Sequence, residues 1–363
     1  MAYYLERDAL EAVALGGCFF GSGGGGTLTS AQHLLENFVQ GDYYPTTKVK
    51  VVSVDEAMVG DAVMVAYMGA PEAINEVQYP EGPVMAAQQV QKRLLEQGRE
   101  LAYVVAPESG ALGFTVACLV AAKLGLAVLD ADGAGRAVPE LPMLTYAMAG
   151  ISPRPAFLVS QEGLCVELDV TPRPNGRNAD ATHQQDVAVI VEQMMRPIVG
   201  NTDFKQFGGL AMWVMQPEQI KKALPITGTL QRALVLGQAL RSGELVTAPA
   251  VVAFLREKFS LFATVLFSGE CQSISLNTNG GFDLGQVCIT HGQQQCTVVY
   301  ENESLLAWDN TQAAPLAMAP DSLNYFVAGS GQPVYSNGDL MVEGDLNPQV
   351  RGRLFSIIGV QAA

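Results

Sequence analysis

The chain has 363 residues, a formal net charge of −15, 49% hydrophobic residues and 16% charged residues. This length exceeds what one hydrophobic core usually supports, so we expect two domains. The acidic balance without a run of Lys and Arg disfavours nucleic-acid binding, and no run of about twenty apolar residues is present to cross a membrane. Because residues 1–15 also lack the pattern of a secretory signal, we expect a cytoplasmic protein.

The first 160 residues alternate between helical and strand-like segments. Apolar spacing predicts helices at 7–15, 84–97 and 115–124, and one that is capped by Thr27 or Thr29 and ends near residue 39. Apolar or alternating runs predict strands at 48–54, 62–67, 101–106, 127–129 and 156–160. Short buried strands between helices are typical of a parallel sheet covered on both faces. We therefore predict an α/β fold with three layers and a mostly parallel sheet.

Residues 169–180 are rich in proline and glycine, and we expect the linker there. Beyond this segment, apolar spacing predicts helices at 186–195, 230–240 and 250–258. From residue 261 onward, short runs rich in branched residues predict antiparallel strands at 262–267, 285–290, 296–300 and 304–308, with two or three more between 332 and 360. The sequence thus predicts an α/β domain over residues 1–170. Residues 171–363 are expected to form a helical connection followed by a β-rich domain.

Four consecutive glycines, Gly23, Gly24, Gly25 and Gly26, follow Ser22 and precede the second predicted helix. Such a run is expected where no side chain fits or where φ must be positive, because it carries a large cost in backbone entropy. Free amides at the start of the helix would face this loop and could bind an anion or a polarised oxygen. These five residues are therefore candidates for substrate binding. The alternative is a tight turn that lets two helices approach closely.

The densest cluster of polar residues lies at 130–140, directly after a predicted strand. Asp130 and Asp132 project to the same side of an extended backbone, and Arg136 and Glu140 follow two glycines. Glu108 ends the neighbouring predicted strand and can reach the same crevice, since ligands bind beyond the carboxyl ends of parallel strands. The four carboxylates are candidates for acid/base catalysis, and Arg136 is a candidate for substrate binding. The alternative is an Asp-Gly turn braced by Arg136.

Three further residues extend this candidate site. Glu76 and Arg196 are candidates for substrate binding, Arg196 because a guanidinium can contact a carboxylate through two hydrogen bonds. His183 lies in a polar run and could hold a divalent metal together with Asp130 and Asp132. Each has an ordinary alternative: a solvated loop carboxylate for Glu76, a helix end for Arg196 and a surface position for His183. Nucleotide cofactors are not indicated, because the Walker and dinucleotide-binding glycine patterns are absent.

Several motifs taken together resemble the S-methyl-thiohydantoin desulfurase family. They are Leu-Gly-Gly-x-x-x-Gly-Ser-Gly-Gly-Gly-Gly near the start, Met68-Gly69-Ala70-Pro71, Pro107-Glu108-x-Gly110, the segment Asp130-Ala-Asp-Gly-x-Gly-Arg-Ala-x-Pro-Glu140 and the late Glu301-Asn302-Glu303. The resemblance spans nearly the whole chain and implies an N-terminal α/β domain and a C-terminal β-rich domain. The sequence departs from the family after Glu108, where the usual two glycines and an asparagine appear as Gly110-Ala111-Leu112-Gly113.

The resemblance implies an enzyme that processes thiohydantoin or hydantoin rings. In the expected reaction, water attacks the ring carbon between the two nitrogens, a carboxylate among Glu108, Asp130 and Asp132 takes its proton, and sulfide or a thiol leaves. Amides of the glycine loop or a divalent cation would stabilise the developing charge. The alternative is a non-catalytic small-molecule-binding subunit, or a subunit that needs a hydantoinase-like partner. A chain this apolar can also bury surface in a homodimer.

Overall fold

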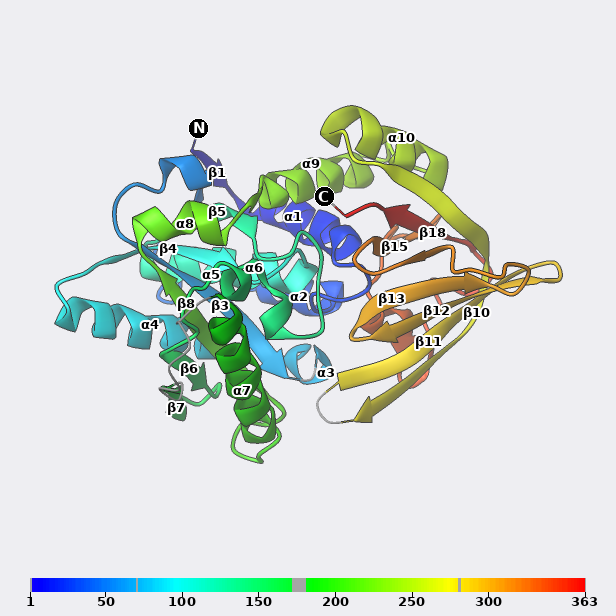
Figure 1. Ribbon diagram of the computed structural model, residues 1–363. Coiled ribbons are helices and arrows are strands. Elements are labelled where there is room, and N and C mark those ends of the chain that lie inside the picture. Colours follow the sequence, from blue (N-terminus) through cyan, green and yellow to red (C-terminus); the bar gives the residue numbers. More distant parts are fainter. Residues whose placement is uncertain (1, 70, 172–180, 280–281, 363) are drawn as a thin grey trace.

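Two β-sheets organise the protein, which is described by a computed structural model over residues 2–69, 71–171, 181–279 and 282–362 (Figure 1). The strands of the first sheet are β1 (Tyr3–Leu5), β2 (Val49–Val52), β3 (Asp61–Gly69), β4 (Leu101–Ala106), β5 (Ala127–Asp132), β6 (Ala156–Val159), β7 (Cys165–Leu168), β8 (Phe207–Met215) and β9 (Ile226–Thr227). Their order is β1-β2-β5-β4-β3-β8-β6-β7, and β9 pairs with β5. Strands β2, β5, β4 and β3 are parallel, and the flanking strands are antiparallel.

Helices cover both faces of this sheet. They are α1 (Arg7–Phe20), α2 (Leu28–Glu36), α3 (Pro71–Ile74), α4 (Glu81–Glu96), α5 (Ala111–Leu124), α6 (Thr145–Met148), α7 (Ala181–Val199), α8 (Pro217–Ala223) and α9 (Thr229–Arg241), whereas α10 (Ala248–Phe259) packs against the second sheet. Successive buried side chains of β3 point to opposite faces of the sheet. Val63 and Val65 belong to the core beneath α1, α2, α4, α5 and α9, whereas Ala62 and Met64 belong to the core beneath α6, α7 and α8. The N-terminal part is therefore a three-layer α/β domain with a parallel centre, as the sequence predicts.

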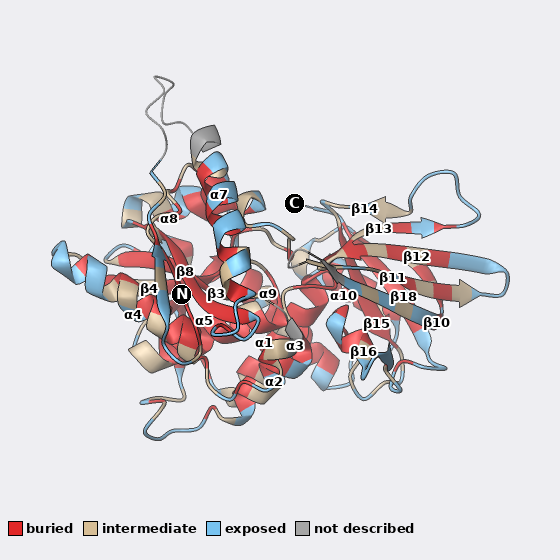
Figure 2. Ribbon diagram, turned by 90° about the horizontal axis from the view of Figure 1, so that it is seen from below, coloured by how far each residue is buried: buried red, intermediate tan, exposed pale blue. Residues whose placement is uncertain are grey.

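The second sheet is antiparallel throughout and is formed by the C-terminal part of the chain. Its order is β14-β13-β12-β11-β10-β18-β15. The strands are β10 (Ala263–Asn279), β11 (Phe282–His291), β12 (Gln294–Glu301), β13 (Glu303–Asp309), β14 (Ala317–Met318), β15 (Ser322–Val327) and β18 (Leu354–Val360), with β16 (Met341–Val342) and β17 (Asp345–Leu346) as a separate pair. Figure 2 shows buried residues running through both sheets. The prediction of a β-rich C-terminal part is confirmed.

One long strand of the first sheet was not predicted from the sequence. Strand β8 follows α7 along the chain, yet it pairs with β3 on one side and β6 on the other. Of its two adjacent glycines, Gly208 lies close to Leu158 and Phe204, and Gly209 is required because α4 crosses the strand at this point. A Cβ on Gly209 would lie 1.9 Å from the carbonyl carbon of Gly82. Segment 172–180 of the expected linker lies outside the described residues.

No helix within the described ranges has both the length and the apolar character needed to span a membrane.

Candidate active site

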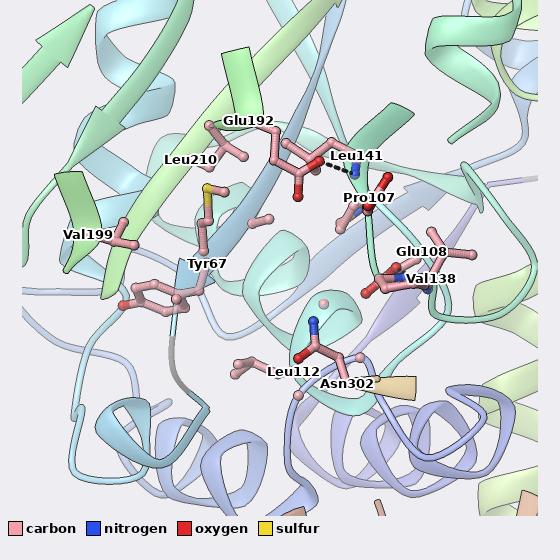
Figure 3. A pocket seen from close by; sticks show the side chains of 18 of the residues that line it. Tyr67, Pro107, Glu108, Leu112, Val138, Leu141, Glu192, Val199, Leu210 and Asn302 are labelled. Atoms are coloured by element: carbon pink, nitrogen blue, oxygen red, sulfur yellow. Dashed lines mark hydrogen bonds between the residues drawn. The ribbon is translucent and has the colours of Figure 1, made fainter. Parts of the chain in front are cut away.

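A cavity of about 300 Å³ lies where the carboxyl ends of β3, β4 and β5 face the second sheet. The α/β domain contributes residues that follow each of these strands, and the glycine loop contributes Gly25 and Gly26. The second sheet closes the cavity with Asn302 and Glu303, at the turn between β12 and β13. Figure 3 shows Glu108, Val138 and Asn302 in its wall, opposite Tyr67, Val199 and Leu210. The site therefore needs both parts of the chain.

The glycine loop is pressed between α5 and the second sheet, which explains its composition. Gly23, Gly25 and Gly26 have positive φ values of 79°, 70° and 79°. A Cβ on Gly24 would lie 2.2 Å from Oε1 of Glu303, and one on Gly25 would lie 2.5 Å from Cα of Gly110. The loop thus allows close packing, and two of its glycines also line the cavity.

Ser22 fastens the glycine loop to the second sheet and does not line the cavity. Its side chain is fully buried, and its hydroxyl accepts a hydrogen bond of 2.9 Å from the amide of Leu323. Its carbonyl accepts a 2.7 Å bond from the amide of Ser304. The sequence-based hypothesis that Ser22 binds substrate is therefore replaced here by a connecting role between the two parts of the protein.

The amides at the start of α2 are occupied by the protein itself. The carboxylate of Asp339 accepts hydrogen bonds from the amides of Leu28 and Thr29, at 2.8 and 3.2 Å, and from the hydroxyl of Thr29 at 2.8 Å. Thr27 caps the helix by accepting from the amide of Ser30. The anion expected at this helix end is thus the side chain of a residue from the C-terminal part of the chain.

Replacement of Asp339 by Ala is expected to lower the free energy of unfolding by about 2–3 kcal/mol, because it leaves buried amide donors without acceptors. Chemical unfolding followed by circular dichroism would measure this loss. D339N keeps an acceptor oxygen and should lose less, and D345A, at an exposed position, should lose little. Equal stability of D339A and D345A would contradict the capping role.

Glu108 and Glu303 place two carboxyl groups in the cavity wall. Burial raises the pKa of Glu108 well above its usual range, and the negative charge of Glu303 raises it further. One oxygen of Glu108 accepts a 2.8 Å hydrogen bond from the amide of Val138, which opposes this shift. Burial also raises the pKa of Glu303 to about 8, although Arg136 and the amide of Gly25 favour its ionised form. The two groups therefore retain protons at neutral pH that ordinary carboxyls would lose.

Arg136 lies behind this pair and connects the two parts of the protein. Its guanidinium is buried and donates to three carbonyl oxygens, those of Ala137 at 2.8 Å, Asp321 at 2.8 Å and Ser304 at 2.9 Å. Burial lowers its pKa, and the nearby charges of Glu303 and Glu108 oppose that shift. Arg136 does not line the cavity, so it acts on a ligand only through its charge.

Asp130 and Asp132 do not line the cavity; both accept hydrogen bonds inside packed protein. Oδ1 of Asp130 accepts from the amides of Leu230 and Gln231, both at 3.1 Å, at the start of α9. Asp132 is fully buried and accepts from the hydroxyl of Ser109 at 2.6 Å and from the amides that begin the next turn. Asp132 thus forms the Asp-Gly turn of the alternative interpretation, but Arg136 does not brace it, because the guanidinium donates to backbone carbonyls instead.

Replacement of Asp132 by Asn is expected to lower the free energy of unfolding by about 1–3 kcal/mol, because charge-assisted hydrogen bonds become neutral ones. Turnover per folded molecule should change little. Thermal unfolding and steady-state kinetics on the same preparation separate the two effects, with the exposed D42N as control. A large loss of turnover at unchanged stability would return Asp132 to the list of catalytic candidates.

The remaining candidates are distributed around the cavity and beyond it. Arg196 lines the wall, forms an ion pair with Glu192 and lies 3.7 Å over the ring of Phe282. Glu192 also accepts a 3.0 Å hydrogen bond from the amide of Leu141, drawn in Figure 3. Glu140 is exposed and contributes to the cavity wall. Arg196 is therefore held in place before any ligand binds.

Glu76 and His183 are not brought into the cavity wall. Glu76 is exposed and lines neither this cavity nor the smaller one described below. His183 falls in the first turn of α7, and its side chain lies outside what the structure describes. Within the described residues, no group of three or more His, Cys, Asp or Glu side chains is arranged to hold a metal ion. The set of Asp130, Asp132 and His183 therefore has no support from the geometry.

Family comparisons agree with this architecture. The model of the S-Me-THD-like N-terminal domain matches residues 8–170, and that of the S-Me-THD-like C-terminal domain matches residues 185–339. The chain belongs to the S-Me-THD-like family. The chain is also similar to a protein from Chromobacterium violaceum whose crystal structure is known: the two sequences are 57% identical, and the structures give a TM-score of 0.90 over 99% of this chain and 92% of that one. No curated protein matches the chain at a significant level.

Glu303 is the site residue that the sequence did not single out. Its motif, Glu301-Asn302-Glu303, carries part of the family resemblance, but spacing alone cannot bring it beside Glu108. The side chain reaches the cavity because β13 begins at Glu303, with the turn at Asn302 aimed toward the glycine loop. Asn302 has a positive φ of 53° at this turn, a backbone conformation that is uncommon for residues other than glycine.

Proposed function

We propose that this S-Me-THD-like protein is a hydrolase that removes the sulfur substituent from a thiohydantoin-type ring. The observation that carries the proposal is the pair Glu108 and Glu303 in a cavity of about 300 Å³, a volume suited to a small ring. Two carboxyl groups with raised pKa values can exchange protons with a bound substrate near neutral pH. Family membership supports the choice of ring, and the reaction itself is the proposal.

Glu303 is assigned as the base and Glu108 as the acid. Glu303 has one buried oxygen, Oε2, with no hydrogen-bond partner among the described residues, so a water molecule that reaches it would supply its first donor. The amide of Gly25 and the charge of Arg136 favour its ionised form. Ionisation of Glu303 raises the pKa of Glu108 further, so Glu108 keeps its proton when Glu303 is ionised. Environments that differ in this way divide two carboxyls into an acid and a base.

The reaction then proceeds by addition and elimination. Glu303 takes a proton from water as the water oxygen attacks the ring carbon between the two nitrogens. The carbon–sulfur bond breaks, and the leaving sulfur takes the proton of Glu108. Substrate and water thus give the oxo ring and a thiol, or hydrogen sulfide when the sulfur is unsubstituted. A proton passed from Glu303 to Glu108 restores the starting state.

The experiment incubates the purified protein with 2-thiohydantoin and with S-methyl-2-thiohydantoin, with and without added divalent metal. A thiol reagent would measure sulfur release, and chromatography would measure the hydantoin product. We expect equal amounts of thiol and hydantoin. Absence of sulfur release and of ring hydrolysis under every condition would reject the hydrolase and favour a binding subunit that uses the same cavity.

A further inference from the structure

The cavity wall carries more carboxyl groups than guanidinium groups. Five carboxyl side chains and one guanidinium line it; the carboxyls belong to Glu108, Glu140, Glu192, Asp283 and Glu303. The guanidinium, that of Arg196, is balanced by its ion pair with Glu192 and stacks on Phe282. Arg136 adds one positive charge behind the wall, where its donors are directed to carbonyl oxygens. A cationic ligand in this cavity therefore meets more carboxyl groups than guanidinium groups, and its charge favours the ionised form of those carboxyls.

Glu303 provides a second and independent indication of a ligand. The residue is 4% exposed, and its Oε2 atom has no hydrogen-bond partner in the described part of the chain. A buried carboxyl oxygen without a donor is costly, so a ligand with an N–H group would relieve a deficit present in the free protein. Glu303 also borders a smaller cavity of about 60 Å³ on the far side of the glycine loop, lined in part by Ser336 and Asn337.

The opposite side of the main cavity carries several apolar side chains beside Glu192 and Arg196. Figure 3 places Tyr67, Val199 and Leu210 across the cavity from Glu108 and Asn302. Leu112 borders the space between these two sides, where the sequence departs from the family pattern. A ligand that satisfies both sides has N–H donors at one end and an apolar substituent at the other.

We propose that this cavity selects five-membered rings that carry a positive charge, with their N–H groups against Glu303 and an apolar substituent toward Tyr67, Val199 and Leu210, and that it rejects rings that carry a carboxylate. The inference rests on the proposed function only for the identity of the ring, and it adds the charge of the species that is bound. Protonation of a ring nitrogen makes the carbon between the nitrogens more electrophilic. A carboxyl group in the wall that ionises when the cation binds would therefore stabilise the ring in its reactive form.

Isothermal titration calorimetry at pH 7.5 tests this inference with three unreactive probes. They are 2-aminoimidazoline, a cation, 2-imidazolidinone, its neutral counterpart, and hydantoin-5-acetate, an anion. We expect the cation to bind at least about tenfold more tightly than the neutral ring and the anion to show no saturable binding. A 4-benzyl substituent on the cation should increase its affinity further. The E303Q variant should lose the preference for charge, whereas E301Q should keep it.

Proton release provides a readout that a general loss of structure would not reproduce. Burial raises the pKa of Glu303 to about 8, so a bound cation should displace its proton. The observed binding enthalpy should then differ between buffers of different ionisation enthalpy, and affinity should rise with pH up to about 8. This dependence should disappear in E303Q.

Equal affinity for the cation and the neutral ring, unchanged preference in E303Q, or no saturable binding of the cation would each overturn the inference. These results are separate from the turnover assay. Turnover without a preference for cationic rings would support the proposed hydrolase and contradict the inference about charge. A preference for cationic rings without turnover of any thiohydantoin would support the inference and contradict the proposed hydrolase activity.

Discussion

Replacement of Glu303 by Gln is expected to lower kcat/KM for thiohydantoin hydrolysis by about 100- to 10,000-fold, because the base that deprotonates water is lost. Gln is nearly isosteric and keeps an oxygen that can accept from the amide of Gly25. Steady-state kinetics with circular dichroism on the same sample would measure both activity and folding. E301Q, two residues away and outside the cavity wall, is the matched control and should retain activity.

The pH dependence of E303Q separates a catalytic role from a structural one. In the wild type, kcat/KM should rise with pH through about 8, since the base acts in its ionised form. Stability should change in the opposite direction. The pKa of Glu303 is raised from its ordinary value of 4.5 to about 8 in the folded state. Between pH 4.5 and pH 8 the folded state therefore binds more protons than the unfolded state. The stabilisation that this provides is lost as the pH rises through about 8. Above pH 8, E303Q should be at least as stable as the wild type. A less stable E303Q at that pH would contradict the assignment.

Replacement of Glu108 by Gln is expected to cause a loss that depends on the leaving group. An acid is needed most when the departing thiolate is basic, so kcat for an S-methyl substrate should fall by about 100-fold or more. The loss should be much smaller for an S-aryl substrate, whose thiolate leaves without a proton. Parallel kinetics on the two substrates would measure this difference.

The same comparison distinguishes the two carboxyls from each other. E303Q should lose similar activity toward both substrates, because water must be deprotonated in either case. E96Q, exposed at the end of α4 and remote in sequence from the cavity segments, serves as the control for E108Q. Equal losses in E108Q for the S-methyl and S-aryl substrates would contradict the role of Glu108 as acid.

Much of the fold follows from local patterns in the sequence. The strand predicted at 101–106 coincides with β4, and the apolar runs before residues 69 and 132 form β3 and β5, because buried parallel strands read as continuous apolar segments. The prediction that polar residues gather beyond these strand ends placed Glu108 and Glu140 at the cavity. Strand β8 was not predicted; it contains two adjacent glycines, which weaken a strand pattern, and Gly209 is required only because α4 crosses the strand there.

The sequence alone predicted an α/β part with a parallel sheet, a β-rich C-terminal part and a loop in which side chains cannot be tolerated, since these depend on periodicity and on the conformational range of glycine. Only the tertiary structure decided which carboxylates face the cavity. Asp130 and Asp132 are close in sequence to Glu140, yet neighbouring amides and hydroxyls engage them inside the protein. Glu303 is distant in sequence from Glu108, and the packing of the second sheet against the glycine loop brings it to the same cavity. Long-range packing determines burial, and burial determines which carboxyl can hold and transfer a proton.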